Sequence, residues 1–180
     1  MLSKKIGLIL LLSILFISIP AFAQGSATES PFWLSQLFGR LHPMMVHFPI
    51  ALLLVAGVME LFTLRNFHHS FRAGIRFLVI LGAISAAISA GMGWLLAENE
   101  GITGSSLDLH RTIGLISAGL SIFLFVFLRK SELNPSNTSI KTYRLILFLT
   151  SIGVGVAGHF GAALTHGEDY LTEVLPQNSD

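Results

Sequence analysis

Four long apolar segments constrain the fold of this chain more than any other feature. They run from about Met44 to Leu64, Phe77 to Leu96, Thr112 to Leu128 and Leu145 to Leu164, with short polar connectors between them. Each is close to the roughly 20 residues that a helix needs to cross a bilayer. A segment that faces lipid must satisfy its own backbone hydrogen bonds, so we expect helices. Because the connectors are short, we predict an all-α, four-helix antiparallel transmembrane bundle in a lipid bilayer.

The composition supports a membrane protein and excludes several other classes. Of the 180 residues, 52% are hydrophobic and only 12% are charged, and the mean hydropathy is +0.72. A soluble domain carries about twice that charged fraction. The net charge of +1 leaves no basic stripe to follow phosphates, so nucleic acid is not an expected partner. The absence of cysteine excludes disulfides, cysteine-ligated zinc, iron–sulfur clusters and haem attached through Cys-x-x-Cys-His.

The N-terminus has the features of a targeting segment. The sequence MLSKK supplies positive charge, IGLILLLSILFISIP is an apolar core, and AFA at 21–23 matches a small-x-small cleavage site. We therefore predict a secretory signal peptide, with an uncleaved signal anchor as the alternative. Both place the residues after Ala23 outside the cytoplasm. The predicted divisions of the chain are a signal peptide (1–23), a periplasmic segment (24–41), the transmembrane domain (42–171) and a periplasmic tail (172–180).

The charges of the connectors orient the predicted bundle. Arginine and lysine collect in the connectors at 65–76 and 129–144, whereas the connector at 97–110 and the C-terminal tail are acidic. The positive-inside rule then places the basic connectors in the cytoplasm. The acidic connector and the C-terminus face the periplasm of a bacterial inner membrane. Glu60 is the one acid well inside a predicted span, near its cytoplasmic end and close to Arg65. We expect it to be paired or to snorkel toward the interface, and not to be catalytic.

The histidines are distributed unevenly over this predicted topology. Two of the seven, His68 and His69, belong to a basic connector, and we interpret them as solvated. The others come from three helices and are predicted at the periplasmic end: His42, His47, His110, His159 and His166. At about 1.5 Å rise per residue, His47 and His159 should form a deeper pair beneath the other three.

Imidazoles that face each other inside a helical bundle are typical of b-type haem. Neutral imidazole ligates haem iron, and ionisable groups within a bilayer usually face a functional interior. Glycine-rich stretches in the second and fourth helices leave room for a flat macrocycle, and Arg40 and Arg111 are placed to pair with propionates. We predict haem b with His47 and His159 as axial ligands and His110 as the first alternative.

His42 and His166 could serve a second, shallower haem, although the spacing is tight for two. The predicted function is one-electron transfer between a membrane donor, such as quinol, and a periplasmic c-type cytochrome or respiratory complex. Because a fully ligated haem leaves no open position for a substrate, we do not expect an enzyme.

Two other interpretations of the histidines stay open. Histidines can hydrogen-bond helices together without a cofactor, and glycine repeats usually indicate close helix packing. The protein would then be a membrane scaffold or assembly subunit. Alternatively, Asp108 could join His42, His110 and His166 in a periplasm-facing site for zinc or copper.

Three segments resemble a known family: LHPMMVHFPIALLL, DLHRTIG and GHFGAALTHGEDYL. They are similar to the predicted bacterial membrane proteins grouped as domain of unknown function 2231. The resemblance covers about Leu41 to Leu171 and rests on an HP-x-x-VHFP opening, an HR-x-x-G motif and a GH-x-G-x-x-x-x-HG closing. It implies a four-helix membrane domain, sometimes found beside c-type cytochrome domains in longer proteins. Since this chain has no c-type haem motif, such a partner would be a separate protein.

Overall fold

A computed structural model describes residues 32–67 and 70–174. The predicted signal peptide, His68, His69 and the end of the tail (175–180) lie outside the described residues. The chain divides into two units, residues 1–33 and 34–180. The account below concerns the second unit.

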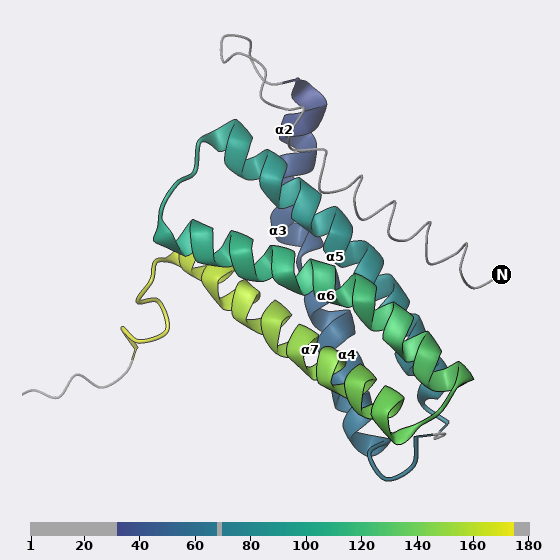
Figure 1. Ribbon diagram of the computed structural model, residues 1–180. Helices are drawn as coiled ribbons and strands as arrows, with labels where there is room; N and C mark the ends of the chain where they lie inside the picture. Colours follow the sequence, from purple (N-terminus) through teal and green to yellow (C-terminus); the bar gives the residue numbers. More distant parts are fainter. Residues whose placement is uncertain (1–31, 68–69, 175–180) are drawn as a thin grey trace, which may run out of the picture. The chain divides into compact units, whose positions relative to one another are not determined.

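Helices make up most of this unit (Figure 1). They are α2 (Trp33–Arg40), α3 (His42–Met45), α4 (His47–Phe62), α5 (Arg72–Glu100), α6 (Ser105–Leu133) and α7 (Asn137–His166). Four helical stretches are long and apolar enough to cross a membrane: Trp33–Phe62, Arg72–Glu100, Ser105–Leu133 and Asn137–His166. The described residues contain no strand. The prediction of an all-α fold with four membrane-spanning helices is therefore confirmed.

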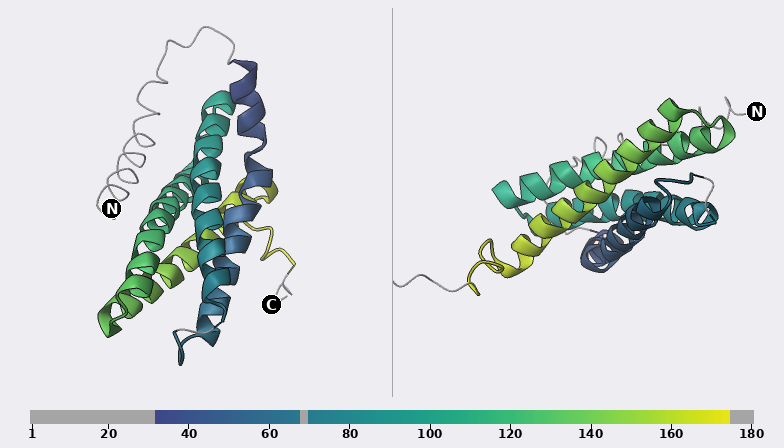
Figure 2. Two further views of the ribbon diagram at one scale, coloured as in Figure 1. Left: turned by 90° about the vertical axis from the view of Figure 1, so that its right-hand side faces the viewer. Right: turned by 90° about the horizontal axis from the view of Figure 1, so that it is seen from below.

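The long helices form two hairpins, α4–α5 and α6–α7, that pack side by side (Figures 1 and 2). Within the bundle, α4 contacts α5 and α7, and α6 contacts the same two helices. At one end of the bundle, α3 and the start of α6 lie together with the C-termini of α5 and α7. We call this the histidine end. The opposite end, where α4 and α6 finish and α5 and α7 begin, is the arginine end.

Local sequence explains where the helices break. Pro49 has no N–H to donate to the carbonyl of Met45, and the helix is interrupted nearby at Val46, between α3 and α4. Gly101, at φ 61°, ends α5 in the left-handed conformation that glycine adopts at little cost. Ser136 and Ser139 cap the start of α7 reciprocally. His42 opens α3 before this interruption, and His47 opens α4 directly after it.

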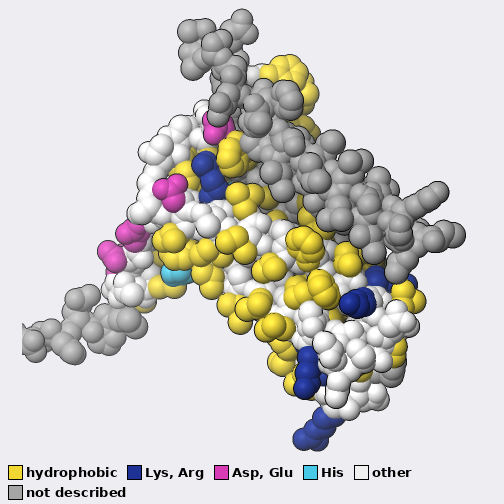
Figure 3. Space-filling model, viewed as in Figure 1, with side chains coloured by type: hydrophobic (Ala, Val, Ile, Leu, Met, Phe, Trp, Pro, Cys, Tyr) yellow, Lys and Arg dark blue, Asp and Glu magenta, His cyan; other side chains and the backbone are white. Residues whose placement is uncertain are grey.

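The surface matches a bilayer environment. Figure 3 shows hydrophobic side chains over the middle of the bundle, with most Lys and Arg in view at one end and the Asp and Glu in view at the other. Inside, Leu53 of α4 is fully buried. It packs against Gly82 of α5, where an added methyl group would come within 2.7 Å of the leucine side chain. Small residues at such contacts let membrane helices approach closely.

Candidate cofactor site

A cavity of about 840 Å³ opens at the histidine end between the two hairpins. Small residues from three helices contribute to its wall: Ala90 and Gly93 of α5, Gly114 and Ala118 of α6, and Gly158 and Gly161 of α7. Side chains this small leave the space between the helices open. The cavity can therefore admit a flat, largely apolar group.

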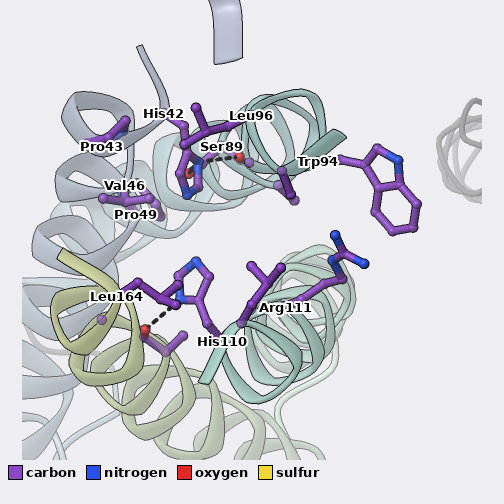
Figure 4. Close-up of a pocket in the computed structure, with 18 of the residues that line it drawn as sticks. His42, Pro43, Val46, Pro49, Ser89, Trp94, Leu96, His110, Arg111 and Leu164 are labelled. Atoms are coloured by element: carbon purple, nitrogen blue, oxygen red, sulfur yellow. Dashed lines mark hydrogen bonds between the residues drawn. The ribbon is translucent and has the colours of Figure 1, made fainter. Parts of the chain in front are cut away.

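His42 projects from α3 into this cavity, as Figure 4 shows. Its Nδ1 lies 2.9 Å from the backbone carbonyl oxygen of Ser89 on α5. A carbonyl oxygen can only accept a hydrogen bond, so Nδ1 carries the proton and donates it. The other ring nitrogen, Nε2, then keeps a free lone pair. This is the tautomer that a metal-ligating histidine usually has, because its second nitrogen donates to a carbonyl or carboxylate.

His110 repeats this arrangement from α6. Its Nδ1 donates to the carbonyl oxygen of Ala157 on α7 over 2.8 Å. Its Nε2 therefore also keeps a free lone pair. We count α3, which leads into α4, with the first hairpin. Each hairpin then presents one imidazole near its start, and the returning helix of the same hairpin, α5 or α7, holds it.

The two imidazoles face each other across the cavity. Their ring centres are 5.9 Å apart and their planes are inclined at 75°. Figure 4 shows the ring nitrogens that are not engaged with a carbonyl pointing toward one another. Within the described part of the chain, neither Nε2 has a hydrogen-bond partner. With metal–nitrogen bonds of about 2.0–2.1 Å, two imidazoles on opposite sides of one metal ion have ring centres about 6 Å apart.

The two predicted arginines line the same cavity but differ in their partners. The guanidinium carbon of Arg111 lies over the ring of Trp94, 4.7 Å from its centre. In residues 32–67 and 70–174, Arg111 makes no ion pair. Arg40 instead pairs with Glu100 at 3.6 Å, and both side chains are exposed. Arg111 is therefore the arginine with charge left to offer an anionic group.

The other predicted site residues do not converge in this way. His47 is exposed and lines the cavity, and its Nδ1 is 3.3 Å from the carbonyl oxygen of Met44 in its own turn. His166 also lines the cavity and is exposed. His159 is exposed and does not line it; its ring centre lies 6.4 Å from that of Tyr170. The structure thus brings together His42 and His110, and does not bring His47 and His159 into one cavity.

Asp108 lies exposed in the first turn of α6 and does not line the cavity. Over the described ranges, no three His, Cys, Asp or Glu side chains form a group that could hold a metal ion. Reasoning from sequence also missed the carbonyl acceptors at Ser89 and Ala157 and the ring of Trp94. Every residue has a backbone carbonyl, so residue type does not reveal which carbonyl accepts a hydrogen bond. The only available signal was the equal spacing of 47 residues between each histidine and its acceptor.

The family model that matches the chain, over residues 40–170, is described as a predicted membrane protein. This match includes both hairpins and both of the facing histidines. No curated protein and no solved structure matches the chain.

Proposed function

The chain belongs to the DUF2231 family of predicted membrane proteins, and we propose that it binds b-type haem, with His42 and His110 as the two axial ligands. One observation carries the proposal: imidazoles from separate hairpins direct their free nitrogens at one another, with ring centres 5.9 Å apart. This pair takes the place of His47 and His159, which the sequence favoured for the same role.

The number of protein ligands favours haem over a bare metal ion. Structural zinc takes four protein ligands and catalytic zinc takes three. Here two imidazoles converge, and no third acid or histidine joins them among the described residues. Haem iron needs only two ligands from the protein, because the macrocycle occupies the other four positions.

The surroundings of the pair also fit a haem. The cavity volume of about 840 Å³ and the glycine and alanine residues in its wall suit a flat macrocycle. Arg111, stacked on Trp94 at the cavity and without an acidic partner in the described residues, is placed to bind a propionate. Together these residues would hold and orient the haem and balance the charge of a propionate.

A bound b-type haem supplies reversible one-electron exchange. If both imidazoles held the iron, no position would remain open for a substrate, which favours an electron carrier over an enzyme. The acidic connector lies at the histidine end, and the positive-inside rule assigns this end to the periplasm. The proposed donor is then a membrane reductant such as quinol, and the acceptor a periplasmic c-type cytochrome or respiratory complex.

A membrane scaffold is the second candidate, and one observation favours it. The hydrogen bonds from His42 to Ser89 and from His110 to Ala157 tie helices together without any cofactor. A tie of this kind uses only Nδ1, however. It gives no role to the two Nε2 atoms that face each other.

Visible spectra of the full-length protein purified in detergent test the proposal. We expect a sharp α band after dithionite reduction, lost in both His42→Ala and His110→Ala. The matched controls His47→Ala and His159→Ala should keep it. A colourless protein after expression with added haemin would reject haem and favour the scaffold. Loss of the band only in the two control variants would return the ligands to His47 and His159.

A further inference from the structure

Each hairpin builds its half of the site in the same way. The acceptor of His42 lies 47 residues further along the chain, at Ser89. The acceptor of His110 also lies 47 residues further along, at Ala157. In both cases a glycine follows the acceptor by one helical turn, Gly93 and Gly161. The two half-sites therefore share one pattern of histidine, carbonyl acceptor and glycine.

These glycines lie directly against the imidazoles. A methyl group added at Gly93 would come within 2.7 Å of Cε1 and 3.0 Å of Nδ1 of His42. One added at Gly161 would come within 3.0 Å of Cε1 and 3.2 Å of Nδ1 of His110. Real side chains essentially never approach to 2.7 Å, because carbon atoms in contact settle at about 3.5–4.0 Å. The ring would have to move away from the helix that holds it.

The same register extends along both hairpins. When His42 is aligned with His110, Gly93 aligns with Gly161. In the same alignment Arg76 matches Arg144, and Leu96 matches Leu164. The two hairpins also run in the same order and direction. Such parallel repeats are related by an axis along the membrane normal. The imidazole pair lies between the two repeats, with one ring from each.

We infer that Gly93 and Gly161 are positioning residues of this site. Each leaves room for one imidazole to lie against the helix, so that the ring points toward the other imidazole. The inference rests on the proposed function for the identity of the ligand, but its geometry concerns only the protein. The carbonyl fixes which nitrogen carries the proton, and the glycine fixes how close the ring lies to the helix. Together they set the direction of Nε2.

A methyl group at either position should break this arrangement. The displaced ring loses its hydrogen bond to the carbonyl, so the proton is no longer held on Nδ1. Nε2 would turn away from its counterpart, and this histidine would no longer hold the iron of a bound haem. Because the approach is tighter at Gly93 than at Gly161, Gly93→Ala should have the larger effect.

Two control substitutions separate positioning from general damage. Gly155, on α7, has open space where a methyl group would be added. Gly82, on α5, would press a methyl group against Leu53 and not against a histidine. Gly155→Ala should therefore change nothing, and Gly82→Ala should lower stability without altering either imidazole.

The first measurement is the spin state of the iron. Full-length variants are purified in detergent, and their oxidised and reduced visible spectra are recorded with and without carbon monoxide. The parent should be six-coordinate and low-spin and should not bind carbon monoxide. In Gly93→Ala most of the protein should become five-coordinate and bind carbon monoxide, and in Gly161→Ala a smaller share. Spectra identical to the parent in both variants would overturn the inference.

The second measurement does not depend on haem. Nitrogen NMR of ¹⁵N-histidine-labelled protein after dithionite reduction distinguishes a protonated from an unprotonated Nδ1, with His42→Gln and His110→Gln providing assignments. The parent should show both residues with the proton on Nδ1, and each glycine variant should lose that state at its own histidine. A colourless parent with these NMR states would reject haem and keep the inference. If Gly93→Ala does not fold, Gly161→Ala decides, and an unchanged His110 then overturns the inference.

Discussion

The carboxylate of Glu60 on α4 accepts a hydrogen bond of 2.8 Å from Nε of Arg144 on α7, across 84 residues of sequence. The same carboxylate accepts two bonds from Arg72 of α5, at 2.8 and 3.2 Å, and one from the hydroxyl of Tyr143 at 2.8 Å. Glu60 is fully buried. One acid thus joins three helices at the arginine end, and its partners are Arg72 and Arg144 rather than the expected Arg65.

Replacing this acid should destabilise the bundle strongly. Glu60→Gln leaves two arginines close together without a counter-charge, and breaking a buried ion pair by removing one partner costs about 3–5 kcal/mol. Glu100→Gln is the matched control, because its pair with Arg40 is exposed and such pairs contribute about 0–1 kcal/mol. Titration with dodecyl sulfate in mixed detergent micelles measures the unfolding midpoint of each variant. Similar midpoints for the two variants would contradict a structural role for Glu60.

A second stability prediction separates buried from lipid-facing leucines. Leu53 is fully buried and Leu54 is 39% exposed, although they are neighbours on α4. Lipid is about as apolar as leucine, so truncating a lipid-facing side chain in a membrane loses little. Leu53→Ala leaves an internal cavity and should lower the free energy of unfolding by about 1–3 kcal/mol. The same substitution in the core of a soluble protein costs about 2–5 kcal/mol. Leu54→Ala should fall within about 0.5 kcal/mol of the parent in the same micelle titration, and an equal loss in both would mean that α4 is rotated.

The number of membrane-spanning helices could be predicted from sequence, but their full lengths could not. Hydropathy indicated a second span from Phe77 to Leu96, whereas α5 runs from Arg72 to Glu100. The apolar run marks the part of a helix in the hydrocarbon core. Polar turns continue the helix beyond that core, where water and side chains satisfy its ends.

The pairing of the histidines depended on helix rotation, which depth along the axis does not reveal. Ala157 and Gly161 face His110, so His159, two residues from each, points about 160° away from them at 100° per residue. His42 and His47 are five residues apart, which turns them about 140° from each other. The ring of His42 faces inward, and His47 is exposed. The choice between them required knowledge of the helix faces.

The orientation in the membrane is testable because the chain has no cysteine. Thr103 lies in the connector at the histidine end, and Thr138 lies in the first turn of α7 at the arginine end; both are exposed. The basic connectors should stay in the cytoplasm. A membrane-impermeant maleimide should therefore label Thr103→Cys in spheroplasts and Thr138→Cys only after lysis. The reverse pattern would place the histidine end in the cytoplasm and remove the periplasmic acceptor from the proposed function.

Arg111 should tune the redox potential of the proposed haem. Its guanidinium is held by the ring of Trp94 at the cavity, without an ion pair in the described residues. A nearby positive charge disfavours the oxidised iron, so Arg111→Gln should lower the midpoint potential by on the order of 50 mV. Arg40→Gln should shift it much less, because Glu100 balances that charge in an exposed pair.

Spectroelectrochemical titration of the two arginine variants and of Trp94→Leu tests this role. Trp94→Leu keeps the charge but removes the ring that holds it, so the guanidinium spends more time in solvent. We expect a shift in the same direction as Arg111→Gln but smaller. Equal shifts for Arg40→Gln and Arg111→Gln would mean that only the total charge at the histidine end matters, and the assignment of Arg111 to a propionate would then be wrong.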